Sequence, residues 1–302
     1  MTSASAPLPM TPARWAILAI GVPMALAVIG TGVAGWASGA ITGLTRQVSY
    51  QRAVSVPATG GHVNVTVDNA DATLGGSTGD RIWVRGTFRG SLVRPTFSWR
   101  STAAGLALHS RCQVPAGVCS LRYAITAPAR LPVAVTDSSG NLDARGFRGA
   151  VTVSDGSGDL GVADLAGNIR LDDGSGNIAA SRLAGGIRLD EGSGDINASG
   201  LSGGIRFQDG SGNVVIDRLA GTDVSGSDGS GDITLTFTKV PERVQVSDGS
   251  GNVEVVLPPG RTAYDVIARS SSGNTAVAVP RSSSSKHVII VTDQSGDITI
   301  AN

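Results

Sequence analysis

Acidic side chains that recur at a fixed spacing are the residues of this sequence with the clearest capacity for chemistry. The tripeptide Ser-Gly-Asp/Asn occurs nine times, and its successive glycines are 18 to 23 residues apart. The residue after the glycine forms one column: Asn141, Asp159, Asn177, Asp195, Asn213, Asp232, Asn252, Asn274 and Asp297. The residue three positions before the glycine forms a second column: Asp137, Asp155, Asp173, Glu191, Asp209, Asp228, Asp248, Ser270 and Asp293. Stacked carboxylates repel one another unless they are solvated, paired or bridged by a cation.

Calcium is the first ligand to consider, because it prefers carboxylate and carbonyl oxygens. The repeat is similar to that of the calcium-binding β-rolls, whose nonapeptide is Gly-Gly-x-Gly-x-Asp-x-apolar-x. Here, however, the acid directly follows the second glycine, and five of the nine repeats have Asn instead. A structural ladder that satisfies the turn backbone is therefore favoured, with no metal or cofactor. In the alternative, a cation or small-ligand module, calcium ligands would come from Asp155, Asp159, Asp173, Asp195, Asp209, Asp228, Asp232 and Asp248.

Catalysis is not expected from these acids. An active site is a single cleft that places different groups around a substrate. The Asp-Gly-Ser-Gly pattern instead recurs in near-identical form along the chain, with no histidine close by. The sequence therefore predicts that the protein is not an enzyme.

The elements that carry the two columns are short strands. A unit such as 167–184 contains two alternating strands and two turn clusters, and it is too small to bury its apolar side alone. Stacked units would share one core, with equivalent residues about 4.8 Å apart. The predicted inward residues of three units are Ile169, Leu171, Ile178 and Leu183, then Ile187, Leu189, Ile196 and Leu201, then Ile205, Phe207, Val214 and Leu219.

A parallel β-solenoid with coils of about 18 residues follows from this in-register repetition. Tandem antiparallel hairpins are the alternative, since Asp-Gly-Ser-Gly can also close a hairpin. Gly158 and its equivalents are expected to have a positive φ. Arg170, Arg188 and Arg206 recur at outward positions, where some pairing with the second acidic column is available.

A membrane-length apolar segment precedes the repeats. No charged residue lies between Arg14 and Arg46, and Trp15 and Trp36 bracket a run of Ala, Ile, Leu, Val and Gly. Twenty-two helical residues span about 33 Å, enough for the hydrocarbon layer, and tryptophan suits both interfaces. We therefore expect a cytoplasmic tail at 1–14, a transmembrane helix at 15–37 and a linker at 38–57. A cleaved signal peptide, which would give a secreted protein, is the alternative.

The two cysteines indicate on which side of the membrane the repeats lie. Cys112 and Cys119 flank a short stretch with Pro115 and Gly117, so one disulfide is predicted, with two unpaired thiols as the alternative. A disulfide favours an oxidising, extracytoplasmic compartment. The expected localisation is therefore the cell membrane, as a single-pass protein with most of the chain outside the cytoplasm.

The overall charge excludes one class of partner. Twenty-four basic residues balance 24 acidic ones, so the footprint of a nucleic-acid-binding protein is missing. The expected partners are the lipid bilayer, through the N-terminal helix, and an unidentified envelope polymer or protein. Aromatic residues are only 4% of the chain, which disfavours stacked-aromatic sugar platforms.

Three stretches carry a family resemblance: Val63 to Val67, the strand that begins at Leu121, and the run from Val133 through the repeats. They resemble a family of bacterial domains of unknown function that is provisionally named as adhesins. The resemblance covers roughly 58–302, and implies a right-handed parallel β-helix, often carried on one membrane helix in high-GC Gram-positive bacteria. It implies no catalytic or binding residues. We expect an N-terminal β segment at 58–135, a repeat solenoid at 136–302, and a structural, adhesin-like or interaction role.

The end of the rod needs protection, because a bare last coil exposes unpaired backbone groups and apolar side chains. Asp297 to Asn302 is expected to form this last coil. We predict that the polar loop 281–286 folds over it, or else that it contacts the end of another molecule.

Overall fold

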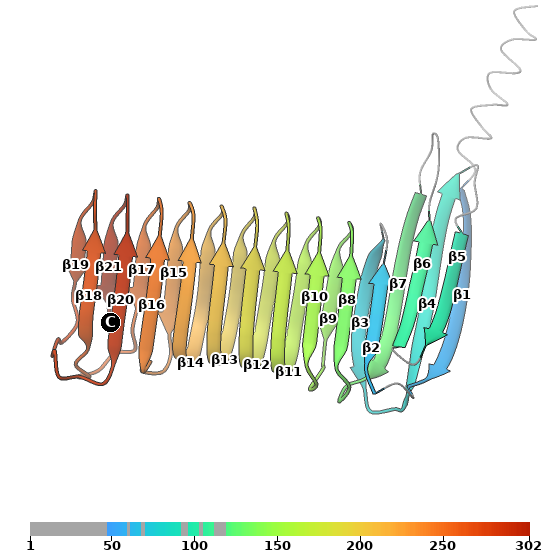
Figure 1. The fold of residues 1–302 in the computed structure, drawn as a ribbon, viewed down its shortest axis with the longest axis horizontal. Helices are drawn as coiled ribbons and strands as arrows, with labels where there is room; N and C mark the ends of the chain where they lie inside the picture. The colour runs from blue at the N-terminus through green and yellow to red at the C-terminus, as the bar shows by residue number, and fades with distance from the viewer. Residues whose placement is uncertain (1–46, 59–60, 68–69, 92–95, 103–104, 112–118) are drawn as a thin grey trace, which may run out of the picture.

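The computed structural model describes residues 47–58, 61–67, 70–91, 96–102, 105–111 and 119–302, and the elements it assigns there are all strands (Figure 1). These residues include no helix that is long and apolar enough to cross a membrane. The predicted tail and transmembrane helix lie outside the described residues. Cys112 does too, so its disulfide with Cys119 stays a prediction.

Two faces of stacked parallel strands form the solenoid (Figure 1). Face A consists, in spatial order, of β2 (Val63–Val67), β8 (Val133–Asp137), β10 (Val151–Asp155), the second halves of β11 (Leu160–Asp173), β12 (Ile178–Glu191), β13 (Ile196–Asp209) and β14 (Val214–Asp228), then β16 (Arg243–Asp248), β20 (Val288–Asp293) and β18 (Asp265–Ser270). Face B consists of β3 (Asp71–Ser77), β9 (Leu142–Arg145), the first halves of β11 to β14, then β15 (Ile233–Phe237), β17 (Val253–Val256), β21 (Ile298–Ala301) and β19 (Thr275–Val277). The predicted all-β solenoid is confirmed.

The register of the strands reproduces the repeat of the sequence. Ile169 lies opposite Ile187, which lies opposite Ile205, so each step advances the chain by 18 residues. All twelve side chains that the sequence placed inside are at most 3% exposed. Gly158 has a φ of 134°, as expected. Parallel stacking of identical positions thus produces one continuous apolar core, and the hairpin alternative is wrong for this part of the chain.

The N-terminal end of the solenoid is closed by antiparallel strands. β1 (Gln47–Pro57) pairs with β4 (Arg81–Ser91), which pairs with β7 (Cys119–Pro128). β7 in turn lies parallel to β3, and the hairpin of β5 (Thr96–Thr102) and β6 (Gly105–Arg111) packs beside β2. The linker expected at 38–57 is therefore wrong from residue 47 onward. This stretch has no long apolar pattern to mark it as a strand, and its place in the sheet comes from backbone pairing with β4 over eleven register positions.

The last two coils stack in the reverse of their sequence order. β20 lies between β16 and β18, and β21 lies between β17 and β19 (Figure 1). The coil of β18 and β19 therefore ends the rod, and the expectation that 297–302 forms the last coil is wrong. Side-chain size explains the order. The inserted coil offers four fully buried residues, Ile289, Val291, Ile298 and Ile300, whereas the end coil offers the smaller set Val266, Ala268, Thr275 and Val277 at the matching positions.

The loop 281–286 does not cover the C-terminal strand β21 as predicted. β19 pairs along β21, so a whole coil shields it instead of the loop 281–286. That loop lies beside the end coil. The Ser285 hydroxyl donates to the Ala263 carbonyl at 2.7 Å, and Arg281 forms an isolated backbone β-bridge with Tyr264. The polar loop thus borders the end of the rod without capping β21.

Candidate functional site

A row of buried carboxylates runs along the solenoid at the ends of the face A strands. Its members are 3% to 6% exposed: Asp137, Asp155, Asp173, Glu191, Asp209, Asp228, Asp248 and Asp293. Ser270, on the end strand β18, continues the row beside Asp293. The pairing with outward arginines that the sequence made available to these acids does not form, because the acids point into the core and Arg170 and Arg188 pair with Asp172 and Asp190.

Each carboxylate of the row is held by the turn that follows it. One oxygen accepts a hydrogen bond from the backbone N–H of the serine two residues later, at 3.3 Å for Asp155 and 2.9 Å for Asp293. The other oxygen is buried without a hydrogen-bond partner among the described residues in Asp155, Asp173, Glu191, Asp209, Asp228, Asp248 and Asp293. Burying such an oxygen in its charged form is unfavourable.

The pKa values of these groups reflect their burial. Burial, and then repulsion from the preceding carboxylate of the row, raises the pKa of Asp173, Asp228 and Asp248 to about 6. The same two causes raise the pKa of Glu191 to about 7. Close to neutral pH these four members of the row therefore exchange protons, with the uncharged form suited to the core.

The protein should become more stable as the pH falls from about 8 to about 5. The folded-state pKa values of these acids lie above the unfolded values near 4, so the folded state binds more protons over this range. Because neighbouring carboxylates of the row share the same repulsion, their contributions to the free energy of unfolding do not add fully. We expect the free energy of unfolding to rise by about 3 kcal/mol in total. Thermal unfolding across this pH range measures it.

Substituting one carboxylate of the row provides the control for this prediction. Asp228→Asn keeps an oxygen for the turn N–H but removes the charge, so it should stabilise the protein at pH 8 and reduce the dependence on pH. A variant that is destabilised equally at both pH values would contradict a buried, proton-exchanging row.

The eight candidate calcium ligands do not come together in one site. Asp155, Asp173, Asp209, Asp228 and Asp248 belong to the buried row, whereas on the turns Asp159 and Asp232 are exposed and Asp195 is partly exposed. Within the described residues, no group of three or more His, Cys, Asp or Glu side chains is arranged to hold a metal ion.

The exposed column after the glycine is a hydrogen-bonded ladder. The Asp159 carboxylate accepts from both the backbone N–H and the side-chain amide of Asn177, at 3.2 and 2.9 Å. The side-chain oxygen Oδ1 of Asn177 in turn accepts from the backbone N–H of Asp195 at 3.0 Å. In space Asp297 lies between Asn252 and Asn274. The spatial order is therefore strictly alternating: Asp71, Asn141, Asp159, Asn177, Asp195, Asn213, Asp232, Asn252, Asp297 and Asn274.

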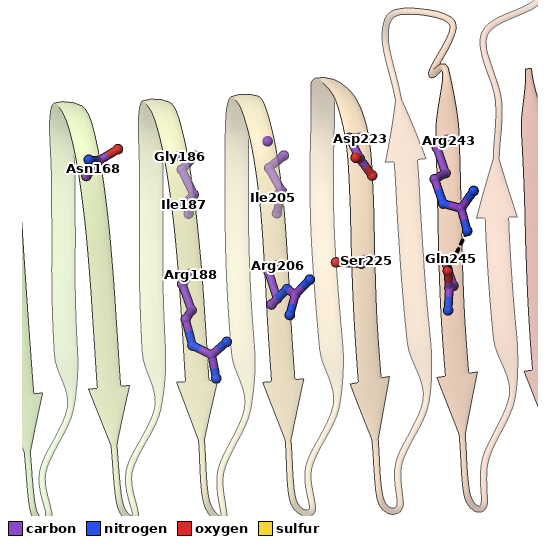
Figure 2. A pocket seen from close by; sticks show the side chains of 11 residues that line it. Asn168, Gly186, Ile187, Arg188, Ile205, Arg206, Asp223, Ser225, Arg243 and Gln245 are labelled. Carbon is purple, nitrogen blue, oxygen red and sulfur yellow. Dashed lines mark hydrogen bonds between the residues drawn. The ribbon is translucent and has the colours of Figure 1, made fainter.

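A shallow groove of about 570 Å³ lies on the outside of face A, across β11 to β16 (Figure 2). Its lining includes Arg188, Arg206, Asp223, Ser225, Arg243 and Gln245. The outward arginine column ends at Arg206, and Ser225 occupies the next position. This step down in side-chain size hollows the surface between two coils with long side chains.

The charge balance changes along this face. Arg170 contacts Asp172 at 2.6 Å and Asp190 at 3.1 Å, and Arg188 contacts Asp190 at 2.6 Å. The next strand has Gln208 opposite Asp190. Arg206 consequently has no acidic partner among the described residues.

The remaining polar groups of the groove surround this unpaired cation. Arg243 donates to the Gln245 side-chain oxygen at 2.8 Å (Figure 2). Asp223, the register partner of Arg243, forms no ion pair with any described residue. The groove thus exposes cationic donors and one carboxylate within a few strands of each other.

Sequence reasoning identified the arginine column but missed the groove. The signal was available in the repeats once they are aligned, because Ser225 replaces arginine and Gln208 replaces aspartate in neighbouring units. A hollow created by such a break depends on side-chain sizes in adjacent coils, which no single repeat reveals.

These features define an all-β solenoid whose parallel coils display ordered rows of outward side chains. The chain belongs to the Toastrack DUF4097 family, whose model matches residues 131–301. A crystal structure provisionally described as a cell adhesion protein, from Clostridium sporogenes, aligns with 12% identity and a TM-score of 0.26 over 84% of this chain and 99% of its own. No curated protein matches the sequence. The expected family of domains of unknown function is confirmed, and it is not a known enzyme family.

Proposed function

We propose that this protein is a membrane-anchored, extracytoplasmic solenoid with an adhesin-like role, binding an envelope polymer or protein through its side. The observation that supports this role most directly is the groove on face A, where Arg206 has no acidic partner among the described residues and polar side chains from successive coils converge. A rigid rod holds such groups at a fixed spacing without a catalytic cleft.

The proposed location rests on the sequence. The uncharged segment 15–36 is long enough to span a bilayer, and the lone cysteine pair suits an oxidising compartment. The solenoid would then project from the membrane by its N-terminal side. A structural role for the rod, without a bound partner, is the simpler form of the same proposal.

Cysteine labelling in intact cells tests the location. With a membrane-impermeant maleimide, Cys112 and Cys119 should become reactive in unbroken cells only after an impermeant reductant is added, and the protein should remain in the membrane fraction. Thiols that are modified only after lysis would place the solenoid in the cytoplasm. Recovery of the protein from the medium would indicate a cleaved signal peptide and refute the anchor.

Cross-linking tests the adhesin-like role. The full-length protein, cross-linked in intact cells, should remain with a purified cell-wall or envelope fraction after detergent extraction. Complete release of the protein into the detergent would contradict an interaction with the envelope and leave only the structural role.

A further inference from the structure

The groove on face A has a chemistry that points to one class of ligand. We propose that it binds an oligosaccharide that carries carboxylate groups, an inference that rests on the adhesin-like function proposed above. Three properties of the groove support this assignment: its length, its unpaired cation and its mixture of donors and acceptors.

The length of the groove suits a linear ligand. The lining residues lie on consecutive face A strands from β11 to β16, and four strand spacings correspond to about 19 Å. An adjoining hollow of about 270 Å³ shares Arg188, Arg206, Ser225 and Gln245, and it extends the depression along the strands. A chain of several sugar rings can therefore contact more than one coil.

Arg206 provides the anchor for an anionic group. It is exposed, and among the described residues it forms neither an ion pair nor a hydrogen bond. Arg188 lies on the neighbouring strand at the same register, about 4.8 Å away at the backbone. A guanidinium binds a carboxylate through two parallel hydrogen bonds, which defines orientation as well as charge.

Asp223 argues against a densely charged ligand. Its carboxylate lines the same groove and has no cation paired with it among the described residues. A polymer with a phosphate on every unit would place negative charge against it, at an electrostatic penalty. A sugar chain instead offers hydroxyl donors between its acidic groups, and Asp223 can accept hydrogen bonds from them.

Amide and hydroxyl groups complete the recognition of sugar hydroxyls. Asn168, Ser225 and Gln245 line the groove and can each donate and accept. The only aromatic residue at the adjoining hollow is Phe207, which is 1% exposed and belongs to the core. Binding therefore depends on hydrogen bonds and charge, and it should weaken as ionic strength rises.

Titration of the full-length protein in detergent tests the proposal, with galacturonic acid trimer as the probe. Isothermal titration should show saturable binding that Arg206→Gln weakens at least about tenfold and that Arg206→Lys weakens less. Asp223→Asn should weaken it severalfold. Arg170→Gln is the matched control, because Arg170 occupies the same column outside the groove and should leave the affinity unchanged.

Three results would overturn the assignment: equal binding of the neutral galactose trimer, tighter binding of a glycerol phosphate oligomer, or no effect of Arg206→Gln. The proposed function is tested separately. If the Arg206→Gln protein still remains with the envelope fraction while the probe does not bind wild type, the glycan assignment fails and the adhesin-like role stands.

Discussion

Gly194→Ala is expected to destabilise the protein by at least about 4 kcal/mol, the largest effect we expect from any single substitution in the solenoid. A Cβ at this position would overlap the carbonyl oxygen of Gly176 in the preceding coil. Neither the Gly194 backbone nor the Gly176 backbone can shift to relieve this overlap, since both belong to turns that are hydrogen-bonded to the neighbouring turns. Overpacking against backbone cannot be relieved by a change of rotamer. Thermal or denaturant unfolding measures the loss.

Gly204→Ala is the matched control for this substitution. Gly204 lies in the next coil, and a Cβ there would meet nothing within 4 Å. Its melting temperature should stay close to that of the wild type. Similar losses in the two variants would show that glycine flexibility, and not the close approach of stacked turns, determines stability.

Ile187→Asp is expected to cost about 4 kcal/mol, because it places a charge among stacked apolar side chains. Ile187 is 3% exposed and lies between Ile169 and Ile205 in the register. Unlike the carboxylates at the turns, an aspartate here would have no free backbone N–H to donate a hydrogen bond to it, since the strand N–H groups already donate within the sheet. The melting temperature measures the effect.

Arg188→Ser tests whether the two faces of the same strand are assigned correctly. The Arg188 side chain is 36% exposed and pairs with Asp190 at the surface, so its loss should cost less than about 1 kcal/mol. Equal shifts of the melting temperature in Ile187→Asp and Arg188→Ser would refute the alternation of inward and outward residues.

The repeat and its apolar alternation predicted the solenoid because each coil repeats the same physical solution. The same alternation also indicates that the acidic row is buried. Asp173 follows Leu171 and Ile169 at intervals of two, so it shares their inward face. An exterior position was nevertheless predicted for these acids, because aspartate is seldom buried in a protein core. Turn amides and a raised pKa make that burial tolerable here.

The order of the last two coils was also encoded, but in a relation between repeats. Along the sequence Asn252 is followed by Asn274 and then Asp297, which breaks the alternation of Asp and Asn. Exchanging the last two units restores it, and the structure has that order. The antiparallel N-terminal strands could not be predicted in this way, because they contain no repeated motif from which register could be inferred.

The insertion of β20 and β21 makes the docking of the end coil depend on a segment that follows it in the chain. Elsewhere each coil contacts the next coil of the sequence, so a terminal coil can detach alone. Among the described residues, the strands of the end coil, β18 and β19, pair only with β20 and β21, which follow them in the chain. When 288–301 separates from β16 and β17, residues 265–277 leave the rod with it, because within the described structure no strand pairing joins them directly to β16 or β17. Amide hydrogen exchange should therefore show that 265–277 opens at a free energy no higher than that of 288–301, and a nascent chain leaves 265–277 undocked until 288–301 has emerged.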